Sequence, residues 1–242
     1  MADVRLQKFL SDAGIMSRRA AEKAISEGRI TVNGSPALTG MKVDPEKDTV
    51  ILDGKKVTRD PSCVYIALNK PSGVITSMSD EKGRPTVAQL VSDCGRRVYP
   101  CGRLDMYSEG LLLLTDDGDV ANRIMHPSHS ISKQYAATVT RELSEAEVRE
   151  LSVPFELDGY MLRPFEVWLD GYQHDINGKT FTKLRFTLHE GRNREIRNIC
   201  ARHGLKIARL TRISVGKITL DGIEPGKWRY LSQDEIDYLK GI

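Results

Sequence analysis

The residues with the clearest capacity for chemistry form a short glycine-bounded loop at positions 102–110. Within it Asp105 follows Arg103 by two residues, and four leucines at positions 111–114 come directly after the loop. A fully apolar run predicts a buried strand, and buried strands fix the loops that they support, which often carry catalytic groups. Asp105 is therefore a candidate catalytic carboxylate. On spacing alone, an ordinary loop acid that forms an Asx turn explains the same residues.

A second stretch, at positions 189–197, is expected to cross from a strand into a helix. It contains Arg192, Arg194 and Arg197, and the last two are spaced so that they share one face of the helix near its first turn. Positive charge at a helix N-terminus opposes the helix dipole. These two arginines therefore need another purpose, such as binding a phosphate or pairing with a buried carboxylate.

Most other signatures of catalysis or metal binding are missing from the sequence. No GxGxxG or GxxxxGK[ST] phosphate loop and no GxSxG nucleophile motif is present. His126 and His129 are three residues apart, but Pro127 disfavours the helix that would direct both at one metal. The acidic run at positions 116–119 contains a glycine, and a turn in which Asp119 caps the next helix explains it without a metal. These segments therefore give no sign of a metal site.

Composition and length argue against several classes of protein. The chain has 242 residues, more than one typical domain of about 100–150 residues, and its hydrophobic (40%) and charged (29%) shares fit folded domains. No apolar run approaches the ~18–20 residues that span a bilayer, and the N-terminus lacks a signal-peptide pattern. The four cysteines form no CxxC pair, which predicts reduced thiols in a cytoplasmic protein.

Positive charge gathers in two separate regions of the chain. The net charge is +3, and positions 1–59 hold 11 Lys/Arg against 8 Asp/Glu. Positions 189–217 hold 8 Lys/Arg against 2 acids. Two separated basic regions are typical of a protein that follows a phosphate backbone, whereas either region alone fits an ordinary solvated surface.

Positions 1–59 are predicted to form a small helix–helix–hairpin module. Apolar residues recur at helical spacing over 4–13, and Ser17 is placed to cap a second helix over 18–26. Strands are expected at 29–32, 49–52 and 55–57, with Asn33-Gly34 as a hairpin turn. The basic residues available for phosphate contact on the helices are Arg5, Lys8, Arg18, Arg19 and Lys23.

Residues 59–62 are interpreted as a linker to a larger domain at positions 63–242. Its strands are expected near 63–68, 134–139, 166–169, 182–188 and 217–220, and its helices near 86–91, 120–125, 144–151 and 194–203. The strands are not separated by regular crossover helices. The larger domain is therefore predicted to be α+β, with a mainly antiparallel mixed sheet and not a doubly wound one.

Three ordered motifs make the sequence recognisable: GRLDMYSEGLLLLTDDG at 102–118, KQY at 133–135 and EGRNREIR at 190–197. Together they resemble the RsuA/RluB-type branch of the pseudouridine synthases. The N-terminal module resembles the S4 RNA-binding domain, with the segments RLQKFL at 5–10 and SRR at 17–19. The resemblance covers nearly the whole chain and implies a pseudouridine synthase fold behind an S4 domain.

The resemblance implies roles for individual residues. Asp105 matches the catalytic aspartate, Tyr135 the tyrosine that stacks on the target base and occupies the general acid/base position, and Arg197 the basic partner of the aspartate. The implied substrate contacts are Arg103, Arg192, Arg194 and Ile213, the last as the aliphatic residue under the base. The implied RNA contacts of the S4 domain are Arg5, Lys8, Arg18, Arg19 and Lys23. Glu195 and Ser108 stand where Gln and Thr are common in the family, and Glu195 adds a negative charge.

The implied reaction breaks the C1′–N1 bond of a uridine in ribosomal RNA, turns the uracil and rejoins it through C5. It needs an ionised Asp105, which attacks C1′ or removes the ribose 2′ proton, and it needs no cofactor. The target is expected in 23S ribosomal RNA, alone or in a pre-ribosomal particle, and the enzyme is expected to be a monomer. The alternatives are a 16S target, an inactive S4-type RNA-binding protein, or a glycosidase-like hydrolase, which would need a second carboxylate as its acid.

Overall fold

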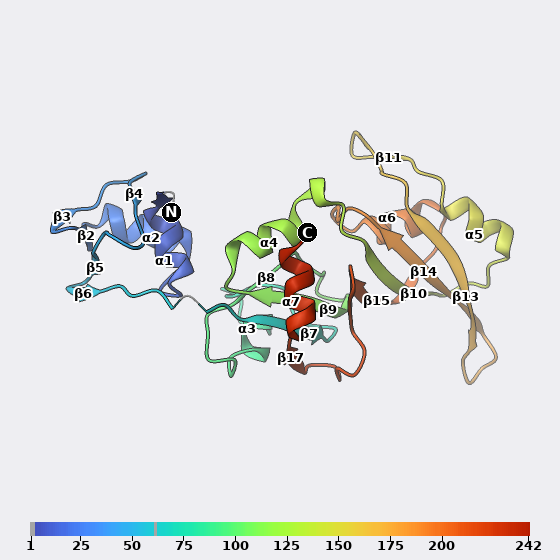
Figure 1. The fold of residues 1–242 in the computed structure, drawn as a ribbon. Coiled ribbons are helices and arrows are strands. Elements are labelled where there is room, and N and C mark those ends of the chain that lie inside the picture. The colour runs from blue at the N-terminus through green and yellow to red at the C-terminus, as the bar shows by residue number, and fades with distance from the viewer. Residues whose placement is uncertain (1–2, 61) are drawn as a thin grey trace. The chain divides into compact units, whose positions relative to one another are not determined.

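The structure is a computed structural model that describes residues 3–60 and 62–242, drawn as a ribbon in Figure 1. The chain divides into two compact units of unequal size. The N-terminal unit comprises Met1–Val64, Gly95–Val98 and Asp116–Gly118. The C-terminal unit comprises Tyr65–Cys94, Tyr99–Thr115 and Asp119–Ile242.

The N-terminal unit contains, within its described residues, two helices that pack beside short strands. These elements are α1 (Leu6–Asp12), α2 (Arg18–Ser26), β1 (Val4–Arg5), β2 (Ile30–Val32), β3 (Ser35–Pro36), β4 (Lys42–Val43), β5 (Val50–Leu52) and β6 (Lys55–Lys56). Strands β3, β2, β5 and β6 form one antiparallel sheet in that order, and β1 pairs with β4. This arrangement matches the predicted helix–helix–hairpin module.

Local sequence explains where these elements begin and turn. Ser17 caps α2, since its Oγ accepts a hydrogen bond from the backbone N–H of Ala20 at 3.1 Å. The predicted Asn33-Gly34 turn has positive φ at both residues, as a two-residue hairpin requires. The first helix starts two residues later than predicted, because Val4 pairs with Val43 across β1 and β4. Apolar side chains from both helices and from the strands then share one core.

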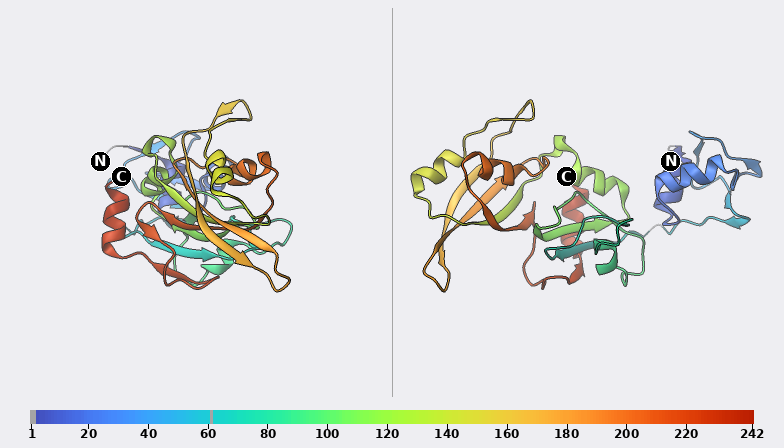
Figure 2. Two further views of the ribbon diagram at one scale, coloured as in Figure 1. Left: turned by 90° about the vertical axis from the view of Figure 1, so that its right-hand side faces the viewer. Right: turned by 180° about the vertical axis from the view of Figure 1, so that it is seen from behind.

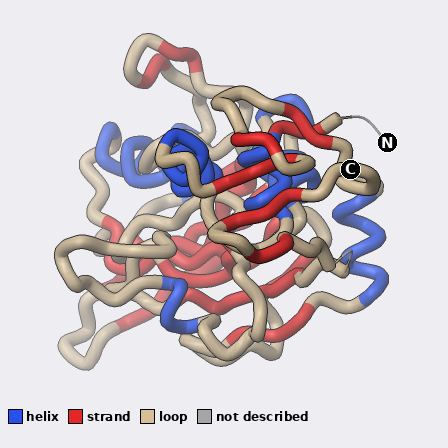
Figure 3. The backbone as a smooth tube through the Cα atoms, turned by 90° about the vertical axis from the view of Figure 1, so that its left-hand side faces the viewer, coloured by secondary structure: helices blue, strands red, loops and turns tan. Residues whose placement is uncertain are grey.

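The C-terminal unit is built on a nine-stranded mixed sheet. Its strands are β7 (Tyr65–Lys70), β8 (Tyr99–Pro100), β9 (Glu109–Thr115), β10 (Lys133–Val139), β13 (Glu166–His174), β14 (Thr180–Leu188), β15 (Ile207–Val215), β16 (Ile218–Thr219) and β17 (Trp228–Tyr230). The main path runs β13-β14-β10-β15-β9-β7-β17, and the strands lie side by side as a twisted layer (Figure 3). The β15–β9 pairing is parallel, and the other pairings described in this sheet are antiparallel. The predicted α+β class with a mainly antiparallel sheet is confirmed.

Several helices and one small hairpin complete this unit. They are α3 (Val87–Leu90), α4 (Gly118–Met125), α5 (Glu145–Leu151), α6 (Glu195–Arg202), α7 (Gln233–Lys240) and the hairpin of β11 (Glu156–Leu157) with β12 (Tyr160–Met161). Helices α5 and α6 lie on the same face of β13, β14 and β10 (Figure 2). Helices α3 to α6 correspond to the predicted ones, whereas α7 was not predicted.

The centre of the sheet fixes the loops that carry the candidate chemistry. All six residues of β7 and six of the seven residues of β9 are buried. Strands covered on both faces have little freedom to shift, so the chain that leaves β7 and the chain that enters β9 are held firmly. Those two segments, residues 71–76 and 102–108, lie against each other around Asp105.

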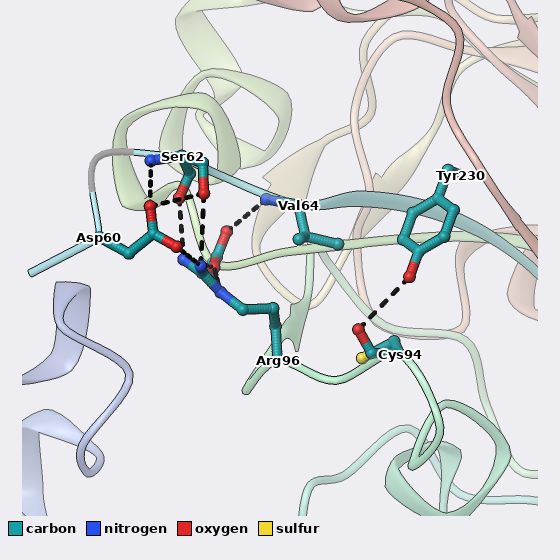
Figure 4. Close-up of polar contacts among 7 residues, drawn as sticks. Asp60, Ser62, Val64, Cys94, Arg96 and Tyr230 are labelled. Atoms are coloured by element: carbon teal, nitrogen blue, oxygen red, sulfur yellow. Dashed lines mark hydrogen bonds and ion pairs between the residues drawn. The ribbon is translucent and has the colours of Figure 1, made fainter.

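Asp60 and Ser62 of the predicted linker contact Arg96 (Figure 4). The Arg96 guanidinium contacts the Asp60 carboxylate at 2.5 Å and the Asp116 carboxylate at 2.9 Å, and it donates to the carbonyl oxygen of Ser62 at 2.8 Å. Asp116 also accepts the backbone N–H of Val64 at 2.7 Å. The acidic run at 116–119 thus has a structural partner of opposite charge.

Candidate active site

Two arginines converge on one oxygen of Asp105. Arg197 Nε lies 3.4 Å and Arg194 Nη1 lies 3.6 Å from Asp105 Oδ2, and the Asp105 side chain is 33% exposed. The structure therefore provides a carboxylate partner for the two arginines whose place at a helix N-terminus needed a reason. Two guanidinium groups thus contact the carboxylate, while its remaining exposure leaves it open to a ligand.

Arg197 also holds the loop that carries Asp105. Its Nη2 donates to the carbonyl oxygen of Tyr107 at 3.2 Å and to Oγ of the buried Ser108 at 3.1 Å. The backbone N–H of Ser108 in turn donates to the carbonyl oxygen of Asp105 at 3.0 Å. The guanidinium therefore contacts both the Asp105 carboxylate and the loop that carries it.

The close approach of β15 to β9 depends on Gly110. This residue has φ +101°, and a Cβ placed on it would lie 2.2 Å from the carbonyl oxygen of Arg212. The Arg212 side chain is buried, and its Nε donates to the carbonyl oxygen of Leu111 at 2.7 Å. A glycine at 110 thus lets the parallel strand pair form immediately after the Asp105 loop.

A buried lysine supports the same loop from β7. The Lys70 side chain is fully buried, and its Nζ donates to the carbonyl oxygens of Pro71 at 2.9 Å and Met106 at 3.3 Å. Burial lowers the pKa of Lys70 to about 8, and the nearby Glu109 and Asp105 carboxylates oppose that shift.

Asp105 opens into a small cavity of about 70 Å³ that six of the predicted site residues line together. They are Arg103, Asp105, Tyr135, Arg192, Arg194 and Arg197. A larger cleft of about 790 Å³ adjoins it and shares the first five of these residues. Tyr135 comes from β10 and is only 9% exposed, so its ring forms a wall of the cavity.

Ile213 is placed differently from the other predicted site residues. Opposite it, consecutive residues Gln134 and Tyr135 of β10 pair with Ser214 and Arg212, so Ile213 is the extra residue of a β-bulge. Among the described residues that line the cavity, the aliphatic side chain contributed by β15 is that of Leu210. Ile213 is not among the described residues that line the cavity or the larger cleft.

Arg192 is held at the mouth of the cavity by a hairpin that the sequence did not reveal. Its guanidinium carbon lies 3.2 Å from the ring centroid of Tyr160 in β12, a cation–π contact. Its Nε lies 3.6 Å from the carboxylate of Glu190, whose other oxygen accepts the backbone N–H of Arg163 at 2.8 Å. These contacts fix the direction of the Arg192 side chain.

Glu195 contributes a second carboxyl group to the cavity wall. It is 4% exposed, and its Oε2 accepts the backbone N–H of Arg192 at 3.0 Å, while Oε1 is enclosed without a hydrogen-bond partner among the described residues. Burial raises the pKa of Glu195 to about 7. The hydrogen bond from the Arg192 N–H to the Glu195 carboxyl closes the turn that carries Arg192 and Arg194.

Three charged residues near the cavity were not predicted from the sequence: Lys70, Lys133 and Arg212. Lys133 lines the larger cleft, and burial lowers its pKa to about 8. Lys70 ends a recognisable buried strand and Lys133 begins the KQY motif, so their positions beside predicted features were an available signal. Arg212 lies in β15, which was not predicted at all.

The basic residues of the N-terminal unit differ in their surroundings. Arg5, Arg18, Arg19 and Lys23 are exposed. Lys8 is half-buried and pairs with Asp12 at 2.8 Å, and Lys23 lies 3.7 Å from Glu27. Arg18 and Arg19 are thus two exposed basic residues in the first turn of α2.

Two absences apply to the described part of the chain. Residues 3–60 and 62–242 contain no cluster of three or more His, Cys, Asp or Glu side chains that is arranged to bind a metal ion. None of the helices formed by these residues is long and apolar enough to cross a membrane.

Comparison with known proteins identifies two families within the chain. Residues 64–202 match the RNA pseudouridylate synthase family, and residues 4–50 match the S4 domain. An uncharacterized RNA pseudouridine synthase of Mycobacterium leprae is 46% identical over 240 residues, which cover 98% of this chain and 92% of the relative. Ribosomal large subunit pseudouridine synthase B of Bacillus subtilis is 36% identical over 239 residues (98% and 96%). A crystal structure of a pseudouridylate synthase superposes with a TM-score of 0.65 at 29% identity and covers 98% of this chain and 99% of that one.

Proposed function

This chain belongs to the RNA pseudouridylate synthase family, and on that premise we propose that it converts one uridine of large-subunit ribosomal RNA to pseudouridine. Its partner is RNA, as the S4 domain and the family indicate. The large-subunit target is supported by the B. subtilis relative, which matches over nearly the whole length of both chains. The observation that carries the proposal is the shared cavity of Asp105, Tyr135 and Arg197.

The chemistry proposed for Asp105 takes place on the ribose. An ionised carboxylate either attacks C1′ or removes the 2′ proton, and both routes break the C1′–N1 bond. Arg197 and Arg194 lie within 3.6 Å of Oδ2 and are placed to hold the carboxylate against the ribose. The reaction is an isomerisation, so the composition of the nucleoside is unchanged: the hydrogen at C5 is released to solvent and one is taken up at N1.

The uracil is proposed to lie against Tyr135 while it turns. An aromatic face that stacks on a base contributes about 1–3 kcal/mol per base, and the Tyr135 hydroxyl would serve proton transfer at C5. We assign the aliphatic contact under the base to Leu210, because this residue lines the cavity and Ile213 lies in the bulge.

A cavity of about 70 Å³ cannot hold a duplex, so the target uridine must leave its stack to reach Asp105. Extrusion of a base costs a few kcal/mol. Phosphate contacts from Arg103, Arg192 and Arg194 at the cavity and from the basic residues of the S4 domain would offset this cost. We further propose that the enzyme acts as a monomer in the cytoplasm.

Mapping of pseudouridines tests the proposal directly. The purified chain is incubated with fragments of 23S and 16S ribosomal RNA, and new pseudouridines are located in each. We expect one site in 23S RNA and none in 16S RNA. A pseudouridine in 16S RNA alone would show that the target is the small-subunit RNA. The absence of pseudouridine from both RNAs would favour an inactive RNA-binding protein. Free uracil as a product would favour a hydrolase.

A further inference from the structure

The segment that follows β7 forms hydrogen bonds with the backbone on both sides of Asp105. After Asp105, the carbonyl oxygen of Met106 accepts the backbone N–H of Gly73 at 2.8 Å. Before Asp105, the backbone of Leu104 meets a side chain of that same segment, the hydroxyl of Thr76. The candidate catalytic carboxylate therefore sits between two fixed backbone points.

The Thr76 hydroxyl makes two hydrogen bonds with one residue. Its Oγ1 donates to the carbonyl oxygen of Leu104 at 2.8 Å and accepts the backbone N–H of Leu104 at 3.2 Å. Leu104 is 7% exposed, so these backbone groups have little access to water. The hydroxyl thus takes the place that a neighbouring strand would occupy in a regular sheet.

Thr76 is itself anchored from the far side. Ile75 forms a parallel bridge with Thr86, in which the Ile75 N–H donates to the carbonyl oxygen of Pro85 at 2.9 Å and the Val87 N–H donates to the carbonyl oxygen of Ile75 at 3.0 Å. Thr86 begins α3 with a capping box. A continuous path of hydrogen bonds therefore runs from the start of α3 through Thr76 to the residue before Asp105.

We propose that Thr76 is a positioning residue for Asp105, acting through the backbone of Leu104. The inference rests on the proposed function. Thr76 lines the larger cleft, but its hydroxyl bonds to the backbone of Leu104 and not to the arginines proposed to bind RNA. Bond breaking, in contrast, needs Asp105 in one orientation. Displacement of a reacting group by about 1 Å is enough to cost about 100-fold in rate.

The test compares three variants of the full chain with the wild type in multiple-turnover kinetics on a 23S fragment. Thr76→Val keeps the shape of the side chain and removes the hydroxyl, and Thr76→Ser keeps the hydroxyl. Ser77→Ala is the matched control, because the Ser77 hydroxyl bonds only to Ser79 in the described structure. All rates are measured well below each variant's unfolding midpoint, and Thr76→Ala replaces Thr76→Val if the latter does not fold.

We expect Thr76→Val to lower kcat by about 10- to 100-fold with KM changed less than about threefold. Thr76→Ser and Ser77→Ala should stay within about threefold of the wild type in both constants. Two results overturn the inference: a kcat for Thr76→Val as close to the wild type as that of the control, or a loss in Thr76→Ser as large as in Thr76→Val. An inactive wild-type chain would instead contradict the proposed function.

Discussion

The guanidinium of Arg197 contacts both the carboxylate of Asp105 and the loop that presents it. Nε lies 3.4 Å from Asp105 Oδ2, while Nη2 donates to Ser108 Oγ at 3.1 Å. One side chain thereby sets the charge environment and the position of the candidate catalytic group. A lysine in its place would keep the charge and lose the planar set of donors.

Replacement of Arg197 should therefore affect catalysis more than binding. We expect Arg197→Lys to lower kcat by about 10-fold and Arg197→Met by at least about 100-fold, because only the lysine keeps a positive charge beside Asp105. Tritium release from 5-³H-uridine RNA measures the rate, and filter binding measures RNA affinity. Equal rates for the two variants would show that the charge of residue 197 has no part in the reaction.

Glu195 should make the stability of the fold depend on pH. Burial raises its folded-state pKa from 4.5 to about 7, so the folded chain holds a proton that the unfolded chain releases. The stability that the protonated Glu195 contributes to the folded chain is fully present below pH 4.5, and it is lost as the pH rises through about 7. Glu195→Gln removes this loss, and we expect the variant to be more stable than the wild type by about 1–2 kcal/mol at about pH 8.

Urea unfolding of both proteins at about pH 5 and about pH 8 checks this expectation. The stability difference between Glu195→Gln and the wild type should be small at the lower pH and should favour the variant at the higher pH. If the difference has the same value in both buffers, Glu195 is already ionised in the folded protein at the lower pH and its surroundings have been misjudged.

Gly110 should tolerate no side chain. An alanine Cβ would lie 2.2 Å from the carbonyl oxygen of Arg212, and the φ of +101° is itself unfavourable for alanine. We expect Gly110→Ala to destabilise the chain by more than about 3 kcal/mol or to prevent folding, as thermal or urea unfolding would measure.

Gly178→Ala is the matched control for that substitution. Gly178 also has a positive φ, but no atom lies within 4 Å of the place that an alanine Cβ would occupy there. We expect a loss of about 1 kcal/mol from the backbone conformation alone. Equal losses of stability in Gly110→Ala and Gly178→Ala would show that the close approach of β15 is not the reason why position 110 needs a glycine.

Arg18 and Arg19 should account for part of the salt dependence of RNA binding. Both are exposed at the start of α2, and each phosphate contact that is lost reduces the slope of log K against log salt by about 1. The double replacement by alanine is expected to weaken binding and to flatten the slope by about 2. Arg29→Ala is the control, since Arg29 already pairs with Asp53 at 2.5 Å. An unchanged slope in the double variant would remove these arginines from the RNA interface.

The sequence predicted most of the elements that surround the site but not the strand at their centre. Short helices and strands were found because caps such as Ser17 and turns such as Asn33-Gly34 are encoded by neighbouring residues. Strand β15 was not predicted because Arg209 and Arg212 interrupt its apolar pattern, and their partners in β9 are about a hundred residues away. Helix α7 had a local signal, the capping box that begins at Ser232, that was not used.

The failure to predict β15 also explains why Ile213 was expected to lie under the base although it does not line the cavity. A β-bulge cannot be located without knowing the pairing of β15 with β10, so the aliphatic residue under the base was expected at Ile213, whereas the aliphatic side chain of β15 at the cavity is that of Leu210. In the same way, the hydrogen bonds of Thr76 and Lys70 to the Asp105 loop join residues that only the fold brings together.

The central claim is that one ionised carboxylate, that of Asp105, carries out the chemistry on the ribose. Its most direct test is pseudouridine formation by Asp105→Asn on a 23S fragment, with RNA affinity measured in parallel. The account predicts no detectable pseudouridine and an RNA affinity within severalfold of the wild type. Pseudouridine formation by Asp105→Asn at a rate near that of the wild type would contradict it.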